Sequence, residues 1–290
     1  MKVKTSEPSL FLSDSLKRKV IFFTGKGGVG KTTLAWATAL ALSNRGRKVR
    51  LVSWSPFDGE SIPQNLSEFK VPWEQLEATA CFKEYTLKTL KFEKIFDIVF
   101  ENRILKAFIE VAPGLSETVI AGKVWDLYDR NKQDTLIVDL PATGHALSFF
   151  KSPMGIEKMF ATGFVHRQAG QICDMFISSE TRLDLVTLPE EMPILESEQF
   201  LEKLAALGKF PLGFLHVNQC TPDLPLPSPP PKLIPKEIEK CLLDHALRKK
   251  REERAFQKAA GLPLALIKIP RLTSEQLKET VKQLAAQMEN

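Results

Sequence analysis

The sequence predicts an α/β fold, a doubly wound and mostly parallel sheet with helices on both faces. Short apolar runs rich in Val, Ile, Leu and Phe recur along the chain, as expected for strands that are covered on both sides. These runs alternate with stretches of helical character, which favours parallel strands joined by crossover helices. A glycine-rich loop also separates the first apolar run from the first helical stretch.

Each strand and helix is predicted from its local pattern. The expected strands are Val20–Phe23, Val49–Ser53, Thr135–Asp139, Leu183–Leu188, Leu212–Val217 and Leu264–Ile269. The expected helices cover 32–45, 193–207, 235–259 and 273–289, and the first two of them stop at Gly46 and Gly208. Because all the strands belong to one alternating series, residues 19–290 are predicted to form a single domain.

Other stretches interrupt this alternation. Residues 72–130 contain no clear strand and are expected to be mostly helical, and so are residues 151–180. Both flank the third strand, which predicts a helical layer, or subdomain, beside the sheet. Residues 1–18 are expected to be a flexible polar extension. Seven of the fourteen residues from 222 to 235 are proline, which indicates an extended surface loop.

Composition narrows the classes of function. Hydrophobic residues make up 43% of the chain and the formal net charge is +5, which is too diffuse to indicate nucleic-acid binding. The basic run 248–251 is followed by two glutamates and is interpreted as a solvated helix face. The apolar run at residues 10–12 is too short for a signal peptide or a membrane span, so we expect a cytoplasmic protein without an integral membrane segment.

Cysteine spacing argues against a metal site. Cys81, Cys173, Cys220 and Cys241 form no CxxC pair and no other zinc-ligand spacing, so no zinc is expected. Free, buried thiols in a reducing compartment are the expectation.

Residues 20–34, VIFFTGKGGVGKTTL, fit a phosphate-binding loop between a strand and a helix. The predicted nucleotide-binding residues here are Gly25, Lys26, Gly27, Gly28, Val29, Gly30, Lys31, Thr32 and Thr33. Glycines let successive backbone N–H groups turn toward the phosphates, and the helix start presents its positive end to them. Lys31 is expected to reach the β- and γ-phosphates, and the Thr32 hydroxyl to ligate Mg²⁺. The alternative, a dinucleotide loop, calls for an acid after the second strand, where Trp54 and Ser55 stand.

Four further stretches carry a family resemblance: DTLIVDLPATGHAL at 134–147, APGLSE at 112–117, VTLPEEMPILES at 186–197 and LHVNQ at 215–219. With the phosphate loop, they resemble the arsenite-pump and tail-anchored-protein-targeting ATPase family over residues 18–290. Pro141 stands one place earlier than in the family, and Ser116 replaces an Asp. Lys26, directly after the first glycine, resembles the signature lysine of the deviant phosphate-loop class. In that class this lysine reaches the partner's nucleotide across a dimer; the alternative is an exposed loop lysine.

The resemblance implies roles at matched positions. Asp139 would organise Mg²⁺ through its water shell, although an Asp here also fits a helix cap. The resemblance identifies Asp139, Pro141, Gly144 and His145 as the family's switch II segment. In this segment the backbone of Gly144 would lie near a γ-phosphate. His145 would couple switch II to its neighbours, or serve a plain structural role. Asn218 would pair with the adenine edge, and Pro270 and Arg271 would pack against the base.

Ser55 is the main departure from the family. The family places an Asp there to handle the attacking water, and a serine hydroxyl cannot accept a proton as a carboxylate does. Asp58 lies three residues later and is the candidate substitute, so the predicted catalytic residues are Lys26, Lys31 and Asp58. The sequence thus predicts that ATP and Mg²⁺ bind while hydrolysis is weakened.

Several functions stay open. The leading hypothesis is a dimerising ATPase, as a homodimer or as the regulatory half of a heterodimer whose related subunit supplies the missing acid. The alternatives are an ATP-gated scaffold or chaperone without turnover and, less favoured, a membrane-surface positioning ATPase. Arsenite activation is disfavoured because the cysteines are scattered. A protein client is a further hypothesis, with a small groove lined by Met154, Met159, Phe160, Phe164, Met175 and Phe176 weighed against a packed helical layer.

Overall fold

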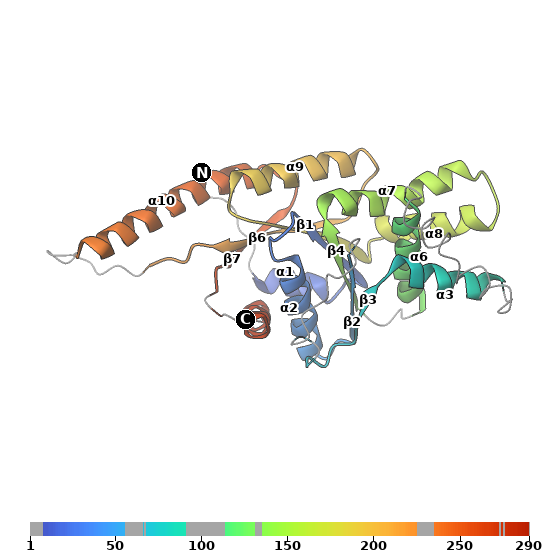
Figure 1. Ribbon diagram of the computed structural model, residues 1–290, viewed down its shortest axis with the longest axis horizontal. Helices are drawn as coiled ribbons and strands as arrows, with labels where there is room; N and C mark the ends of the chain where they lie inside the picture. The colour runs from blue at the N-terminus through green and yellow to red at the C-terminus, as the bar shows by residue number, and fades with distance from the viewer. Residues whose placement is uncertain are drawn as a thin grey trace.

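The computed structural model describes residues 8–55, 66, 68–90, 114–130, 135–224, 235–272, 274 and 276–289. Its centre is a seven-stranded sheet in the order β3-β2-β4-β1-β5-β6-β7, and every neighbouring pair is parallel (Figure 1). The strands are β1 Val20–Gly25, β2 Val49–Trp54, β3 Trp73–Leu76, β4 Thr135–Ala142, β5 Thr181–Thr187, β6 Leu212–Cys220 and β7 Ala265–Pro270. The predicted doubly wound α/β fold is therefore confirmed.

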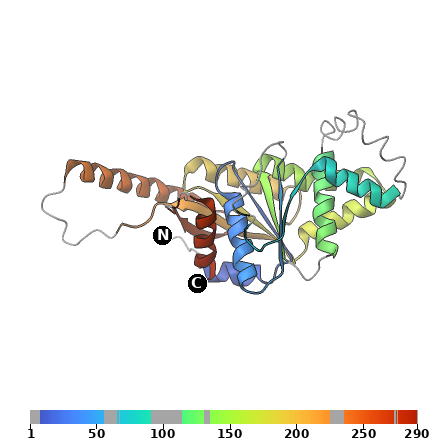
Figure 2. The same ribbon diagram turned by 60° about the horizontal axis from the view of Figure 1, so that its bottom comes forward.

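Helices cover both faces of this sheet. They are α1 Pro8–Ser15, α2 Lys31–Asn44, α3 Ala78–Leu90, α6 Leu115–Arg130, α7 Thr143–Met159, α8 Phe164–Ile177, α9 Glu191–Ala205, α10 Lys236–Ala259 and α11 Leu277–Glu289. Successive side chains of a strand point to opposite faces, so β1 contributes to two separate cores. Ile21 and Phe23 pack with α1, α2 and α11, which lie together in Figure 2, whereas Val20 and Phe22 pack with α6 to α9.

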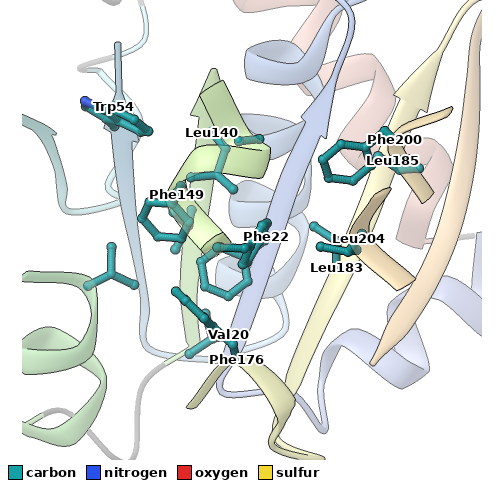
Figure 3. Close-up of a cluster of buried hydrophobic side chains, with 14 of the residues drawn as sticks. Val20, Phe22, Trp54, Leu140, Phe149, Phe176, Leu183, Leu185, Phe200 and Leu204 are labelled. Atoms are coloured by element: carbon teal, nitrogen blue, oxygen red, sulfur yellow. The ribbon is translucent and has the colours of Figure 1, made fainter. Parts of the chain in front are cut away.

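Aromatic rings fill the second core. Phe22 meets Phe149, Phe150 and Phe176 edge-on, with ring centroids 5.5 to 5.9 Å apart (Figure 3). Such edge-to-face pairs are favoured over flat stacks because the ring edge is positive and the face negative. Phe149 and Phe150 come from α7 and Phe176 from α8, so this cluster joins the helical layer to the central strand.

The helical layer consists of α3, α6, α7 and α8, which contact one another. The side of this layer that faces the sheet is packed. Met175 and Phe176 are buried there in the core, so their prediction as groove residues is wrong. On the outer side, Met159, Phe160 and Phe164 are exposed, and their part in a groove stays a prediction. The stretch 91–113 within the predicted layer lies outside the described residues.

Two expected features differ in the structure. Residues 72–130 were expected to hold no strand, yet β3 pairs with β2 at the edge of the sheet. Its sequence, WEQL, lacks the apolar run of a covered strand because an edge strand is only partly buried. Residues 8–15 were expected to belong to a flexible extension, yet they form α1, with Phe11 and Leu12 buried.

A buried charge network holds α1 on the sheet. Arg182 of β5 is 1% exposed and donates to Asp184 on its own strand and to Asp14 of α1. Its guanidinium also lies 4.7 Å from the centroid of the Phe11 ring, a cation–π contact. Burial raises the pKa of Asp184, but the charge of Arg182 together with the contacts of His216 and the Phe214 amide holds the pKa below its ordinary value of 3.8.

We predict that Arg182→Met lowers the free energy of unfolding by about 3–5 kcal/mol at pH 7, because it leaves the Asp184 carboxylate buried without its partner. Urea unfolding followed by circular dichroism measures this. The exposed Arg254→Met is the matched control and should change stability by less than about 0.5 kcal/mol.

Acidification should reduce the difference in unfolding free energy between Arg182→Met and wild type. A depressed carboxyl pKa gives stability that is complete above 3.8 and is lost as the pH falls through the lower folded value. The difference in unfolding free energy should therefore shrink below about pH 4. A gap that stays constant from pH 7 to pH 3 would contradict the ion pair as its source.

Candidate functional site

The candidate site lies where the carboxyl ends of the central strands meet. Strand register sets Gly25, at the end of β1, beside Ala142 of β4 and Val186 of β5. On the other side of β4, Ser53 of β2 pairs with Asp139. Ligand sites of open parallel sheets form at this edge, so the topology alone brings the predicted residues together.

Two glycines of the loop are required by close packing. A Cβ on Gly25 would lie 2.0 Å from the carbonyl oxygen of Val186, so no other residue fits there without moving the backbone. Gly30 has a φ of 95°, and a Cβ on it would meet the amide nitrogen of Asn218 at 2.4 Å. The loop is thus pressed between β5 and the end of β6.

The loop leads into α2 so that the helix start is open to an anion. Gly30 is its N-cap and supplies no side-chain cap, so the first backbone N–H groups have no side-chain acceptor from that residue. Lys31 opens the helix, and its ammonium donates to the carbonyl of Lys26, 3.0 Å away. The helix dipole and the Lys31 charge therefore favour a bound phosphate at one point.

Asp139 is held by hydroxyl groups from two other elements. Thr32 of α2 donates to its Oδ2 over 2.7 Å, and Ser53 of β2 donates to the same oxygen over 3.2 Å. The other oxygen, Oδ1, is buried and has no hydrogen-bond partner in the described part of the chain. Burial raises the pKa of Asp139 to about 6, against the opposing effect of Thr32, Lys31 and Ser53.

A hard cation fits this donor set. A carboxylate and a hydroxyl in contact are oxygen ligands that Mg²⁺ accepts, directly or through water. The unpartnered Oδ1 also gives a cation or its water shell an acceptor that the fold itself leaves unused. Thr32 and Asp139, the predicted metal residues, are thus brought together.

Lys26 lies in a contact within its own chain. Its ammonium is 2.5 Å from Oε1 of Glu196 on α9, and both side chains are about one third exposed or more. Glu196 is the last residue of the Pro189-Glu190-x(5)-Glu196 segment that the sequence singled out. Sequence reasoning gave Glu196 no role of its own.

The switch II segment continues β4 and starts α7. The Thr24 hydroxyl donates to the carbonyl of Pro141 over 2.9 Å, which ties this segment to the strand before the loop. Gly144 is exposed in the first turn of α7, and a Cβ there would meet nothing within 4 Å. His145 follows it in the same turn and is partly buried.

Trp54 fixes the strand end that precedes Ser55. Its side chain is 4% exposed and lies against Phe149 of α7, with ring centroids 6.0 Å apart (Figure 3). Ser55 itself is partly exposed, directly after β2. Asp58, the candidate substitute for the missing acid, lies outside the described residues.

At the end of β6, Asn218 touches the loop. Its amide nitrogen donates to the carbonyl of Val29 over 2.8 Å, so one of its two N–H groups is already engaged. Arg271 follows β7 on the neighbouring strand, where Pro270 pairs with Cys220, and its side chain is exposed. Of these residues, Asn218 contacts the loop, and the role of all three toward a base stays a prediction.

Three residues of this arrangement were missed by sequence reasoning: Thr24, Ser53 and Glu196. Thr24 and Ser53 are polar residues within apolar strands, each near the carboxyl end of its strand. Polar side chains at that edge signal a site, and this could have identified both. For Glu196 the signal is its place at the end of the segment 186–197, whereas its contact with Lys26, 170 residues away in sequence, follows from no local pattern.

The described ranges bear on the predictions about thiols, metal ligands and membrane spans. Cys81, Cys173 and Cys220 are free and buried, whereas Cys241 is exposed, contrary to expectation. No three His, Cys, Asp or Glu side chains gather there as a metal-binding group. Within the same ranges, no helix combines the length and apolar composition that crossing a bilayer requires. The absence of zinc and the cytoplasmic location stay predictions.

Several known proteins are similar in sequence to this chain over more than two thirds of its length. ATPase BagA of Mycobacterium tuberculosis is 28% identical over 221 residues, which are 69% of this chain and 64% of that protein. Putative arsenical pump-driving ATPase 1 of Aquifex aeolicus is 26% identical over 245 residues, 78% of this chain and 59% of its own. ATPase get3 of Neurospora crassa is 27% identical over 212 residues, 69% and 61% of the two chains. The matched region thus spans less than two thirds of each of these relatives.

The sequence pattern of one protein family matches more than half of the chain. Residues 18–181 match the family described as anion-transporting ATPase, and this range contains the loop, Ser53, Asp139 and the start of α7. The relatives named for arsenical pumps and get3 agree with the resemblance that the motifs indicated. The chain therefore belongs to the anion-transporting ATPase family, which includes the arsenical pump-driving ATPases and get3.

Proposed function

We propose that this protein binds ATP with Mg²⁺ and hydrolyses it slowly, as a nucleotide-dependent dimer. The observation that carries the proposal is the pairing of Thr32 with the buried carboxylate of Asp139 at the open start of α2. This pairing sets a cation site beside an anion site, which is the arrangement that a magnesium–triphosphate complex needs. Lys31 and the backbone of residues 25–30 then hold the phosphates.

Weak hydrolysis follows from the end of β2. Ser55 occupies the position where a carboxylate would orient the attacking water, and Trp54 holds the preceding backbone in the core. Losing such a group costs about 10²–10⁴-fold in rate, so binding is retained while turnover falls. Asp58 or a related subunit of a heterodimer could restore an acid.

We predict that Ser55→Asp raises the ATP turnover of the purified protein by about 10–100-fold, since it returns a proton acceptor to a backbone position already fixed by Trp54. Phosphate release at saturating Mg-ATP measures this. The control is Ser55→Asn, because asparagine has the shape of aspartate without its carboxylate. It should turn over ATP at the wild-type rate. Equal rates for the Asp variant and the wild type would contradict the proposal.

For the metal, we predict that Asp139→Asn removes most of the contribution of Mg²⁺ to ATP binding. Loss of a group that orients metal ligands weakens metal affinity by about 10–100-fold. Calorimetric titration with ATP, with and without Mg²⁺, separates this effect, because binding of metal-free ATP is the internal control and should not change. An unaltered response to Mg²⁺ would exclude Asp139 from the metal site.

Dimer formation is proposed to depend on Lys26. In the described protomer Lys26 pairs with Glu196, so it must exchange this partner before it can reach a nucleotide on a second protomer. The dimer is either a homodimer or a pair with a related ATPase subunit. In both cases the ion pair between Lys26 and Glu196 must break before the dimer forms. Dimer formation is therefore opposed by the free energy of one partly exposed ion pair.

We predict that Glu196→Gln lets the dimer form at lower ATP concentration, by up to about fivefold per protomer, because an exposed ion pair contributes at most about 1 kcal/mol. Sedimentation velocity at increasing Mg-ATP measures the dimer. Lys26→Ala is the counterpart and should abolish the nucleotide-dependent dimer. If Lys26→Ala dimerises like wild type, Lys26 has no role across the interface.

A second candidate is an ATP-gated scaffold or chaperone that does not turn over. Ser55 favours it, and so does an apolar cavity of about 280 Å³ in the helical layer, lined by residues of α3, α6, α7 and α8. Met159, Phe160 and Phe164 are exposed on the neighbouring α7 and α8, which gives a protein client an apolar surface. Tight Mg-ATP binding without phosphate release, alone and with a partner, would favour this candidate.

A further inference from the structure

Helix α10 is buried against the protein in its last third, and in its middle His245 and Lys249 contact Pro222 and Asp223. Its buried residues are Glu252, Ala255, Phe256 and Ala259. The preceding part projects beyond the edge of the sheet, as Figures 1 and 2 show, and Ile238, Leu243 and Leu247 on it are 45–59% exposed. A helix segment of about 12–15 residues with few tertiary contacts is only marginally stable in water, so this surface has the character of a docking site.

One face of α10 carries cations and leucines without an acid. Spacings of three and four residues bring onto this face Lys236, Lys240, Leu243, Leu247, Lys250, Arg251, Arg254 and Lys258, which we call the cationic stripe. All eight side chains are exposed, and Glu239 and Asp244 stand outside the stripe, at its borders. Among the described residues, Lys236, Lys240, Lys250 and Arg251 have no ion pair; Lys258 pairs with Glu191.

The stripe runs into a cleft of about 800 Å³. This cleft lies between α10, the start of α9 and the ends of β6 and β7, and Arg251, Arg254 and Lys258 belong to both the stripe and its wall. The wall also contains three acids. Glu252 is buried and accepts hydrogen bonds from the backbone and hydroxyl of Thr221, Glu191 pairs with Lys258, and Glu190 is exposed. Arg248, Lys250 and Arg251 of the basic run are exposed on α10, in agreement with its interpretation as a solvated helix face, and Arg248 and Arg251 also line the cleft.

Charge excludes a second copy of α10 as the occupant. If two stripes paired antiparallel about Leu247, Lys240 would face Arg254 and Lys236 would face Lys258, and like charges in contact repel. A flat bilayer cannot enter the cleft, and two leucines are a small apolar face for a membrane-bound helix. The stripe also has no aromatic residue on which a nucleic-acid base could stack.

We propose that the cationic stripe and its cleft bind an acidic, leucine-bearing segment of a partner protein. Carboxylates of this segment would pair with Arg251 and Arg254 at the cleft, while its apolar side chains would cover Leu243 and Leu247. Guanidinium groups suit this role because they accept carboxylates in a bidentate geometry. No residue of the phosphate loop lines the cleft, but Arg271, the predicted contact of the nucleotide base, does, so the peptide is tested without nucleotide.

The experiment uses fluorescence polarisation with a labelled peptide of about 15 residues, glutamate with leucine at every third or fourth position. The full chain should bind it saturably and more weakly as salt rises. Arg251→Glu/Arg254→Glu should weaken binding by at least about tenfold, the effect of reversing charges that face an acidic ligand. Leu243→Ser/Leu247→Ser should also weaken it by about tenfold, without any change in charge.

Lys203→Glu/Lys282→Glu is the matched control, because it reverses two exposed lysines on α9 and α11 with the same change in net charge. This control should bind the peptide like wild type, and circular dichroism should be unchanged in all variants. The proposal is overturned if the peptide does not bind, or if the control loses binding equally. It is also overturned if a single-stranded oligonucleotide or phosphatidylserine vesicles bind through the same residues more tightly than the peptide.

Discussion

The hydrogen bond from Thr32 to Asp139 is the contact on which the site depends. Thr32 belongs to the first turn of α2 and Asp139 to the end of β4, so this bond fixes the helix start against the central strand. Ser53 adds the neighbouring β2 through the same oxygen. The start of α2, the carboxylate of Asp139 and the strand before Ser55 are thereby held in one arrangement. The proposed cation would satisfy the buried oxygen of Asp139 that the described fold leaves without a partner.

Trp54 connects this arrangement to the helical layer. Its ring lies in the same aromatic cluster as Phe149, which belongs to the helix that starts at switch II. A nucleotide-driven shift of α7 would therefore act on the end of β2 and on α8 together, since closely packed side chains transmit displacement. The end of β2, the start of α7 and α8 are thus packed in one cluster.

The sequence predicts the covered strands and the loop because their signals are local. The central strands are continuous apolar runs, and the glycine, lysine and threonine spacing of residues 25–33 specifies a phosphate loop without tertiary information. β3 is not predicted from the sequence, because an edge strand such as WEQL needs no continuous apolar run. The contacts of Lys26 with Glu196 and of Ser53 with Asp139 join distant segments, so they follow from strand order and not from any motif.

The network around Arg182 also decides where the folding unit begins. The family match starts at residue 18, and the first strand starts at Val20, so either criterion would draw the amino-terminal boundary after α1. Such a boundary removes Asp14 and Phe11 and leaves the fully buried guanidinium without its contacts across the helix. For this chain, the domain extends to a helix that neither periodicity nor family similarity delimits.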